Sequence, residues 1–149
     1  MASWSDVEKE APELTAAVRK RFAVRKHATV ATLRRDGSPR ISGTEVEFSD
    51  GEIWLGSMPG ARKARDLRRD PRLALHSPTV DPPDDDPSAW NGEAKLAGRA
   101  VEVSDPQAVD EPHRFRIDVT EVVLTRVSGD RLVMQLWHPG RGVEFRDRA

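Results

Sequence analysis

The sequence contains no cysteine and no tyrosine, and its only aromatic residues are four tryptophans and four phenylalanines. Without cysteine, the chain has no disulfide, no thiolate ligand for a metal and no cysteine nucleophile. Its four histidines, His27, His76, His113 and His138, are scattered without the spacing of a metal site. No Ser-His-Asp arrangement is indicated either, so chemistry carried out by protein side chains alone has little support.

The sequence also lacks long apolar runs and a surplus of positive charge. No window approaches the roughly 20 apolar residues of a membrane span. Residues 1–10 do not show the basic and then apolar pattern of a signal peptide. The formal net charge is −1, whereas a dedicated nucleic-acid binder normally carries a clear basic excess. We therefore expect a soluble, cytoplasmic protein that binds neither membranes nor nucleic acid.

Length and composition favour one domain over residues 1–149. Domains most often contain about 100–150 residues, and no repeat or second apolar core is visible. The hydrophobic fraction of 37% against 33% charged residues is polar but sufficient for a globular fold.

Charge is unevenly distributed along the chain. Six cationic residues occur close together, and an acidic, proline-rich loop at 79–89 follows them. The cationic residues are Arg62, Lys63, Arg65, Arg68, Arg69 and Arg72. The near-neutral total therefore hides one basic segment and one acidic segment.

The first 25 residues predict a helix over 4–24. Leu14, Ala17, Val18 and Phe22 share one face at helical spacing. Ser5 to Glu8 fits a capping box, and Pro12 suits a first helical turn or a restart of the helix.

From His27 onward the sequence predicts antiparallel strands. Segments 27–34, 39–48 and 52–57 are joined by Asp36-Gly37 and by a turn at 49–51, which is typical of hairpins. After a short helix at 60–69 we expect strands at 72–77, 90–103, 114–127 and 131–137, then a polar tail at 138–149. Gly92 and Gly98 are candidate bulges or close-approach points. The fold class is thus mainly β with short helices, as a barrel or a sandwich.

The basic helix is a candidate phosphate site. The turn at 56–60 leads from a strand into a helix N-terminus, where free N–H groups and the helix dipole favour anions. Ser57 adds a hydroxyl and Lys63 a charge. The alternative is a solvated helix face that turns Leu67 inward.

Several other residues have two interpretations. Trp137 and Arg141 could stack on a ring and bind an anion, or they could close the barrel and belong to the tail. His76 could donate a proton or be a satisfied core histidine. Trp54 and Trp90 are expected in the core or in a dimer contact.

Residues 63–72, after the hairpin with Thr32, Asp36-Gly37 and Pro39, resemble the pyridoxamine-5′-phosphate-oxidase-like family. The resemblance extends over nearly the whole chain and implies an antiparallel split β-barrel of the FMN-binding type. That family contains FMN enzymes and oxidoreductases that use the deazaflavin F420.

The resemblance also implies a cofactor site at a homodimer interface. Lys63 is the implied phosphate ligand, with Ser57 and Met58 lining the turn and Arg62 beside it. The implied contacts on the strands and at the C-terminal end are Thr32, Arg40, Ile41, Ser42 and Arg141.

The implied activity is hydride transfer to or from a small organic substrate, with FMN or F420 as the reactive group. The arginine-rich composition and the basic helix favour F420. The alternative is a non-catalytic binding or storage protein on the same fold. It is supported by Ala61, where many relatives have arginine, and by the absence of a helical insertion after the fifth strand.

Overall fold

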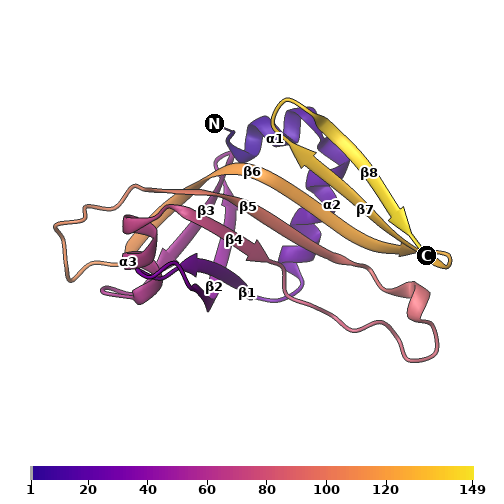
Figure 1. Ribbon diagram of the computed structural model, residues 1–149, viewed down its shortest axis with the longest axis horizontal. Coiled ribbons are helices and arrows are strands. Elements are labelled where there is room, and N and C mark those ends of the chain that lie inside the picture. Colours follow the sequence, from indigo (N-terminus) through magenta and orange to yellow (C-terminus); the bar gives the residue numbers. More distant parts are fainter. Residues whose placement is uncertain (1) are drawn as a thin grey trace.

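The computed structural model describes residues 2–149. Two helices, α1 (Trp4–Glu10) and α2 (Pro12–Ala23), precede an antiparallel sheet, and α3 (Arg62–Arg69) lies between its third and fourth strands. The strands are β1 (His27–Leu33), β2 (Pro39–Ser49), β3 (Glu52–Ser57), β4 (Arg72–His76), β5 (Glu93–Glu102), β6 (His113–Ser128), β7 (Arg131–His138) and β8 (Gly142–Arg148). A short 3-10 turn, η1 (Pro87–Ala89), lies in the acidic loop (Figure 1).

The sheet closes on itself through one additional pairing. Its strand order is β3-β2-β1-β4-β5-β6-β7-β8, and β3 also pairs with β6. Strands β1 to β6 therefore form a closed barrel, and β7 and β8 extend the sheet beyond it (Figure 1). The prediction of a mainly β, antiparallel split barrel with short helices is confirmed.

The predicted hairpin turns have the backbone conformations that their residues favour. Gly37 has a φ of 84°, and Asp50 and Gly51 have φ values of 53° and 73°. Positive φ is accessible to glycine and, among other residues, mainly to Asn and Asp. These two turns align β1 with β2 and β2 with β3.

Gly98 is required by the close approach of two strands. The register between β5 and β6 shifts between Ala97 and Gly98, so the predicted bulge is present. A Cβ atom at Gly98 would clash with the backbone carbonyl oxygen of Asp118, and one at Gly92 would clash with that of Thr125. Both glycines are therefore close-approach points.

The N-terminal region forms two helices instead of one. Helix α1 ends at Ala11 and Pro12 begins α2, because proline suits a first turn but lacks the N–H that a continuous helix needs. The capping box lies earlier than predicted. Ser3 accepts the Asp6 N–H through Oγ, and Asp6 accepts the Ser3 N–H in return. The predicted Ser5–Glu8 box was wrong.

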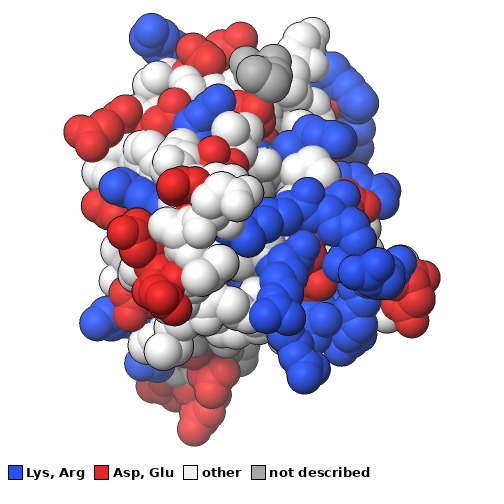
Figure 2. Space-filling model, turned by 90° about the vertical axis from the view of Figure 1, so that its left-hand side faces the viewer, with Lys and Arg blue, Asp and Glu red and all other residues white. Residues whose placement is uncertain are grey.

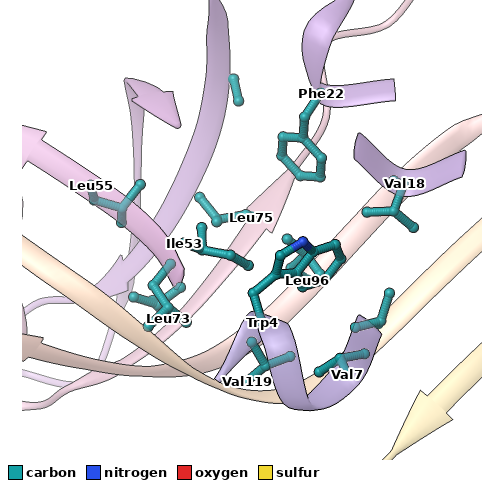
Figure 3. Close-up of a cluster of buried hydrophobic side chains, with 14 of the residues drawn as sticks. Trp4, Val7, Val18, Phe22, Ile53, Leu55, Leu73, Leu75, Leu96 and Val119 are labelled. Carbon is teal, nitrogen blue, oxygen red and sulfur yellow. The ribbon is translucent and has the colours of Figure 1, made fainter. Parts of the chain in front are cut away.

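The core lies between the two N-terminal helices and the barrel. Trp4, Val7, Val18 and Phe22 point toward side chains of β3, β4, β5 and β6, such as Leu96 (Figure 3). No helix within residues 2–149 is long and apolar enough to cross a membrane.

Residues 138–149 form strand β8 and not only a polar tail. Gly140 and Gly142 have φ values of 79° and 67°, which allow the chain to reverse after β7. Strand β8 then pairs with β7 along its whole length. The sequence interpretation missed this strand because Arg141, Glu144 and Arg146 to Arg148 make the segment polar on an outer edge.

Candidate functional site

A groove of about 1460 Å³ lies where the end of α2 meets β2, β3 and the turn before α3. The turn at residues 57–61 runs along it, so the predicted phosphate segment borders a cavity. The residues that line the groove are 22–27, 43–47, 54–59, Lys63 and 112–114.

Ser57 and Lys63, the two predicted phosphate contacts, both line this groove. The hydroxyl oxygen of Ser57 is buried and has no hydrogen-bond partner among the described residues. Lys63 donates from Nζ to the carbonyl oxygen of Gly43 at 2.8 Å. Partial burial lowers the pKa of Lys63, because removal from water disfavours the charged ammonium. A nearby anion would reverse that effect.

The N-terminus of α3 adds backbone donors beside these two residues. Its N-cap residue is Ala61, which supplies no side-chain hydrogen bond to the first turn. The first N–H groups of an uncapped helix carry partial positive charge and attract anions. Together, the lysine, the serine hydroxyl and the helix N-terminus match the chemistry of a phosphate ligand.

The turn before α3 is held from β6. Gly60, with a φ of 72°, donates its N–H to Nε2 of His113 at 3.1 Å. His113 also lies against Arg68, whose guanidinium pairs with both carboxylate oxygens of Glu102 at 2.7 and 2.8 Å. That pairing lowers the pKa of Glu102.

An aromatic wall bounds the groove on β3. Trp54 donates from Nε1 to the carbonyl oxygen of Ser49 at 3.0 Å, which fixes its ring. The guanidinium of Arg114 lies over that ring, 4.1 Å from its centroid. Such stacking is a favourable cation–π contact. The wall therefore presents an aromatic surface with a positive charge on it.

A second, smaller depression of about 500 Å³ lies on the outer side of α3. Six arginines and two aspartates line it, so it is strongly positive: Arg34, Arg35, Asp36, Arg40, Arg62, Arg65, Asp66 and Arg69. Figure 2 shows a dense group of Lys and Arg side chains at the end of the molecule that carries α3. We call this surface the arginine depression.

Asp66 lies buried beneath the arginine depression and accepts hydrogen bonds from two of its arginines. Its carboxylate is 2% exposed and accepts hydrogen bonds from Thr32 at 2.7 Å, Arg40 at 2.7 Å and Arg69 at 3.0 Å. Burial alone would raise the pKa of Asp66, but these hydrogen bonds lower it overall. The carboxylate is therefore an ionised centre that fixes two arginines.

The predicted site residues fall into three groups. Ser57, Met58 and Lys63 line the groove. Arg40 and Arg62 line the arginine depression, because Arg62 and Lys63 leave α3 in different directions. Thr32 is buried under that depression against Asp66.

The remaining predicted residues border neither cavity. Ile41 is 75% exposed on β2 and Ser42 is half-buried on the same strand. Arg141 is exposed in the turn between β7 and β8, where it pairs with Glu144 at 3.9 Å. It lines neither the groove nor the arginine depression.

Burial distinguishes Trp137 from Trp54 and Trp90. Trp137 is 1% exposed and donates to Glu10 at 2.8 Å, so it belongs to the core and does not stack on a ligand. Trp54 and Trp90 are only half-buried, and neither is in the core cluster. His76 contacts Glu93 and the Ser77 carbonyl oxygen away from both cavities, which leaves it no role at the groove.

Sequence reasoning missed three residues of these cavities: Asp66, His113 and Arg114. Asp66 lies among cationic residues of the predicted helix, and its burial depends on contacts with β1 and β2. His113 and Arg114 begin β6 and reach the groove only through the β3–β6 pairing, in which Ser57 faces His113. Their separation from residue 57 along the chain hides this contact.

A closed antiparallel barrel with an anion-binding turn beside a groove defines a class of split-barrel proteins. Residues 14–136 match the family described as pyridoxamine 5′-phosphate oxidase. The chain belongs to this family, as the resemblance in the sequence implied.

Solved structures support the same fold. An FMN-binding protein from Nostoc punctiforme, described as pyridoxamine 5′-phosphate oxidase-related, has a TM-score of 0.65 at 9% identity, covering 100% of this chain and 98% of that one. A heme binding protein from Mycobacterium smegmatis has a TM-score of 0.61 at 22% identity, covering 83% of this chain. This chain spans 57% of the length of that protein.

A protein described as an F420 reductase has a TM-score of 0.51 at 15% identity, covering 68% of this chain and 92% of that one. FMN and F420, the two cofactors expected from the sequence, are thus both named among these relatives. No curated protein matches the sequence.

Proposed function

We propose that the protein is an FMN- or F420-dependent oxidoreductase that transfers hydride to or from a small organic substrate. The observation that carries this proposal is the combination of Lys63, the unpartnered Ser57 hydroxyl and the uncapped N-terminus of α3 at one end of the groove. The bound cofactor would supply the hydride chemistry. The chain would bind it, orient it and exclude water.

The residues present fit a phosphate-bearing cofactor. A buried hydroxyl without a partner is costly unless a ligand satisfies it, and a phosphate oxygen accepts such a hydrogen bond. Lys63 would exchange its contact with the Gly43 carbonyl for the phosphate charge. The backbone N–H groups at the start of α3 would complete the set of donors.

The rest of the groove fits a ring and a small substrate. Its volume of about 1460 Å³ exceeds that of most small-molecule pockets. The Trp54 ring under Arg114 offers an aromatic face for a ring system, and the positive charge suits an electron-rich one. We propose that Trp54 and Arg114 contact the ring system or the substrate.

Between the two cofactors we favour F420. The arginine depression carries six arginines against two aspartates, and two of those arginines, Arg40 and Arg69, already donate to Asp66. The remaining positive charge suits a cofactor with several negative groups beyond one phosphate. FMN carries a single phosphate, so its binding would not require the additional positive charge of the arginine depression.

We further propose that the protein acts as a homodimer with the cofactor at the interface. Ile41 on β2 and Met58 in the turn before α3 are 75% and 79% exposed, and Met58 lines the groove. Large apolar side chains exposed to solvent are typical of an interface.

The proposal is tested by titrating the purified protein with FMN and with F420. Lys63→Ala should weaken binding of the preferred cofactor by about 1.5–3 kcal/mol, the value of a charge-assisted contact. Lys95→Ala, on the exposed face of β5, is the matched control and should bind as the wild type does. If neither cofactor binds at micromolar concentration, the proposed function is wrong.

The second candidate is a non-catalytic protein that stores or carries the same cofactor. The observation that favours it is Ala61 at the N-cap of α3, which leaves the anion-binding turn with fewer side-chain donors. The two candidates separate in turnover assays with reduced cofactor and a panel of quinones, enones and tetrapyrroles. A storage protein would bind the cofactor and show no turnover with any of them.

A further inference from the structure

His113 occupies an unusual position for a buried histidine. It is the first residue of β6, is 4% exposed and faces the turn before α3 from across the β3–β6 pairing. The N–H of Gly60 points at Nε2 of His113 with a nitrogen-to-nitrogen distance of 3.1 Å. A side chain distant in sequence therefore holds the middle of the anion-binding turn.

The second ring nitrogen determines which tautomer can do this. Nδ1 of His113 lies 2.9 Å from Nη2 of Arg68 and 3.6 Å from Oε1 of Glu102. A neutral imidazole has one N–H and one acceptor nitrogen. Nε2 can accept from Gly60 only if the proton is on Nδ1, where the Glu102 carboxylate attracts it. In that tautomer Nδ1 cannot accept from Nη2 of Arg68, which keeps its two bonds to Glu102. The opposite tautomer would let Nδ1 accept from Arg68 and would give up the Gly60 contact, so the two tautomers make different predictions.

From this geometry we infer that His113 is a positioning residue for the anion-binding turn and acts only in its neutral form. The inference rests on the proposed function, because the turn is the proposed phosphate contact. Gly60 lies three residues before Lys63, and its φ of 72° is a conformation that most residues avoid. By fixing Gly60, His113 orders the backbone between Ser57 and the first turn of α3.

Acidification should release this contact. A proton added to Nε2 places an N–H against the N–H of Gly60, and two donors repel each other. The charged groups that face the ring are Arg68 from α3 and Glu102 from β5. Lys63 and Arg114 line the same groove, and Arg65 approaches Gly60 from α3.

Two matched substitutions test the role of each ring nitrogen. His113→Gln places an amide oxygen near the position of Nε2 and cannot titrate, whereas His113→Asn reaches only as far as Nδ1. FMN and F420 are titrated against each protein at about pH 8 and about pH 5.5, which spans the ordinary range of histidine. His76→Gln, a histidine distant from the groove, is the control.

We expect the wild type and His76→Gln to lose about tenfold more affinity on acidification than His113→Gln, the value of one hydrogen bond. Because a phosphate monoester itself titrates near about pH 6, only the difference from His113→Gln counts. His113→Asn should bind about tenfold more weakly at pH ~8. Equal pH dependence in the wild type and His113→Gln would overturn the inference.

A measurement without cofactor separates this inference from the proposed function. Nitrogen NMR of the wild type should show the proton of neutral His113 on Nδ1. The protection factor of the Gly60 amide, which corrects for the slower intrinsic exchange of every amide at lower pH, should fall when the ring is protonated. A proton on Nε2, or an unchanged Gly60 amide, would refute the role of His113. Failure of both cofactors to bind would refute the proposed function and leave these NMR results to decide the inference.

Discussion

At the scale of single residues, two carboxylates hold the side chains of arginines around α3. Asp66 is held by Thr32, Arg40 and Arg69, and Glu102 is held by Arg68. Each carboxylate fixes arginines from the basic segment that would otherwise be free to move in solvent. Asp66 and Glu102 thus pair with part of the positive charge of the basic segment. Other cationic residues of that segment line the two cavities.

Asp66→Ala should destabilise the fold strongly. Removal of one partner from a buried ion pair leaves Arg40 uncompensated and costs about 3–5 kcal/mol in the free energy of unfolding. Urea denaturation measures this quantity. Asp84→Ala in the exposed acidic loop is the control and should change stability little. Similar losses in both variants would show that Asp66 is not the anchor we describe.

The lowered pKa of Asp66 predicts how the stability of the wild type changes with pH. The folded-state pKa of Asp66 is lowered, so its contribution to stability is present above the ordinary pKa of an aspartate and is lost as the pH falls. The wild type should therefore lose more stability than Asp66→Ala between neutral and acidic pH. An identical acid dependence in both proteins would contradict the lowered pKa.

At the scale of elements, a β-bulge and one strand pairing determine which residues line the groove. The bulge at Gly98 shifts the register of β5 against β6, and the β3–β6 pairing then brings the start of β6 beside the end of β3. His113 and Arg114 reach the groove only because of that pairing. Helix α3, whose Leu67 is buried as the alternative interpretation expected, spans from β3 to β4 and presents Lys63 and Arg62 to different cavities.

Gly98→Ala should test the strand contact. The added methyl group meets the backbone of Asp118 and the side chain of Ile117, so the strands must separate or the bulge must shift. We expect a loss of about 1–3 kcal/mol in the free energy of unfolding, as for other overpacked sites. Gly43→Ala, where no atom lies within 4 Å, is the matched control. A thermal denaturation midpoint that falls equally in both would argue against a steric cause.

At the scale of the whole molecule, the two charged segments lie far apart. The arginine depression lies along α3. The acidic loop with η1 projects from the opposite end of the molecule (Figure 1). The net charge of −1 therefore describes neither surface. A ligand near α3 meets a positive field, which agrees with a small anionic cofactor.

The proposed homodimer makes a prediction at this scale. Ile41→Glu places a charge on the exposed face of β2 and should shift the dimer toward monomer in light scattering coupled to size exclusion, with weaker cofactor binding. Val109→Glu, at a side chain 71% exposed in the loop before β6, is the control. A wild-type protein that is monomeric at micromolar concentration would refute the dimer itself.

The sequence by itself determined the barrel and the family. Alternating Val, Ile and Thr and the two hairpin turns are local signals of antiparallel strands, and the resemblance of residues 63–72 to the family indicated the split barrel. The position of Ser57 and Lys63, the proposed phosphate contacts, at the groove also followed from local order, since a turn into a helix N-terminus is contiguous in the chain. Strand β8 was not predicted, because a polar edge strand leaves weak periodicity. The restart of the helix at Pro12 was one of two alternatives that the sequence left open.

Only the tertiary structure decided which residues share a cavity. Asp66 becomes a buried centre through β1 and β2, and His113 reaches Gly60 through a strand pairing that closes the barrel. The directions of Arg62 and Lys63, and the burial of Trp137 against Glu10, likewise depend on how the elements pack. Contacts between residues distant in the chain leave no local pattern, because the energy that selects them comes from packing and not from neighbouring residues.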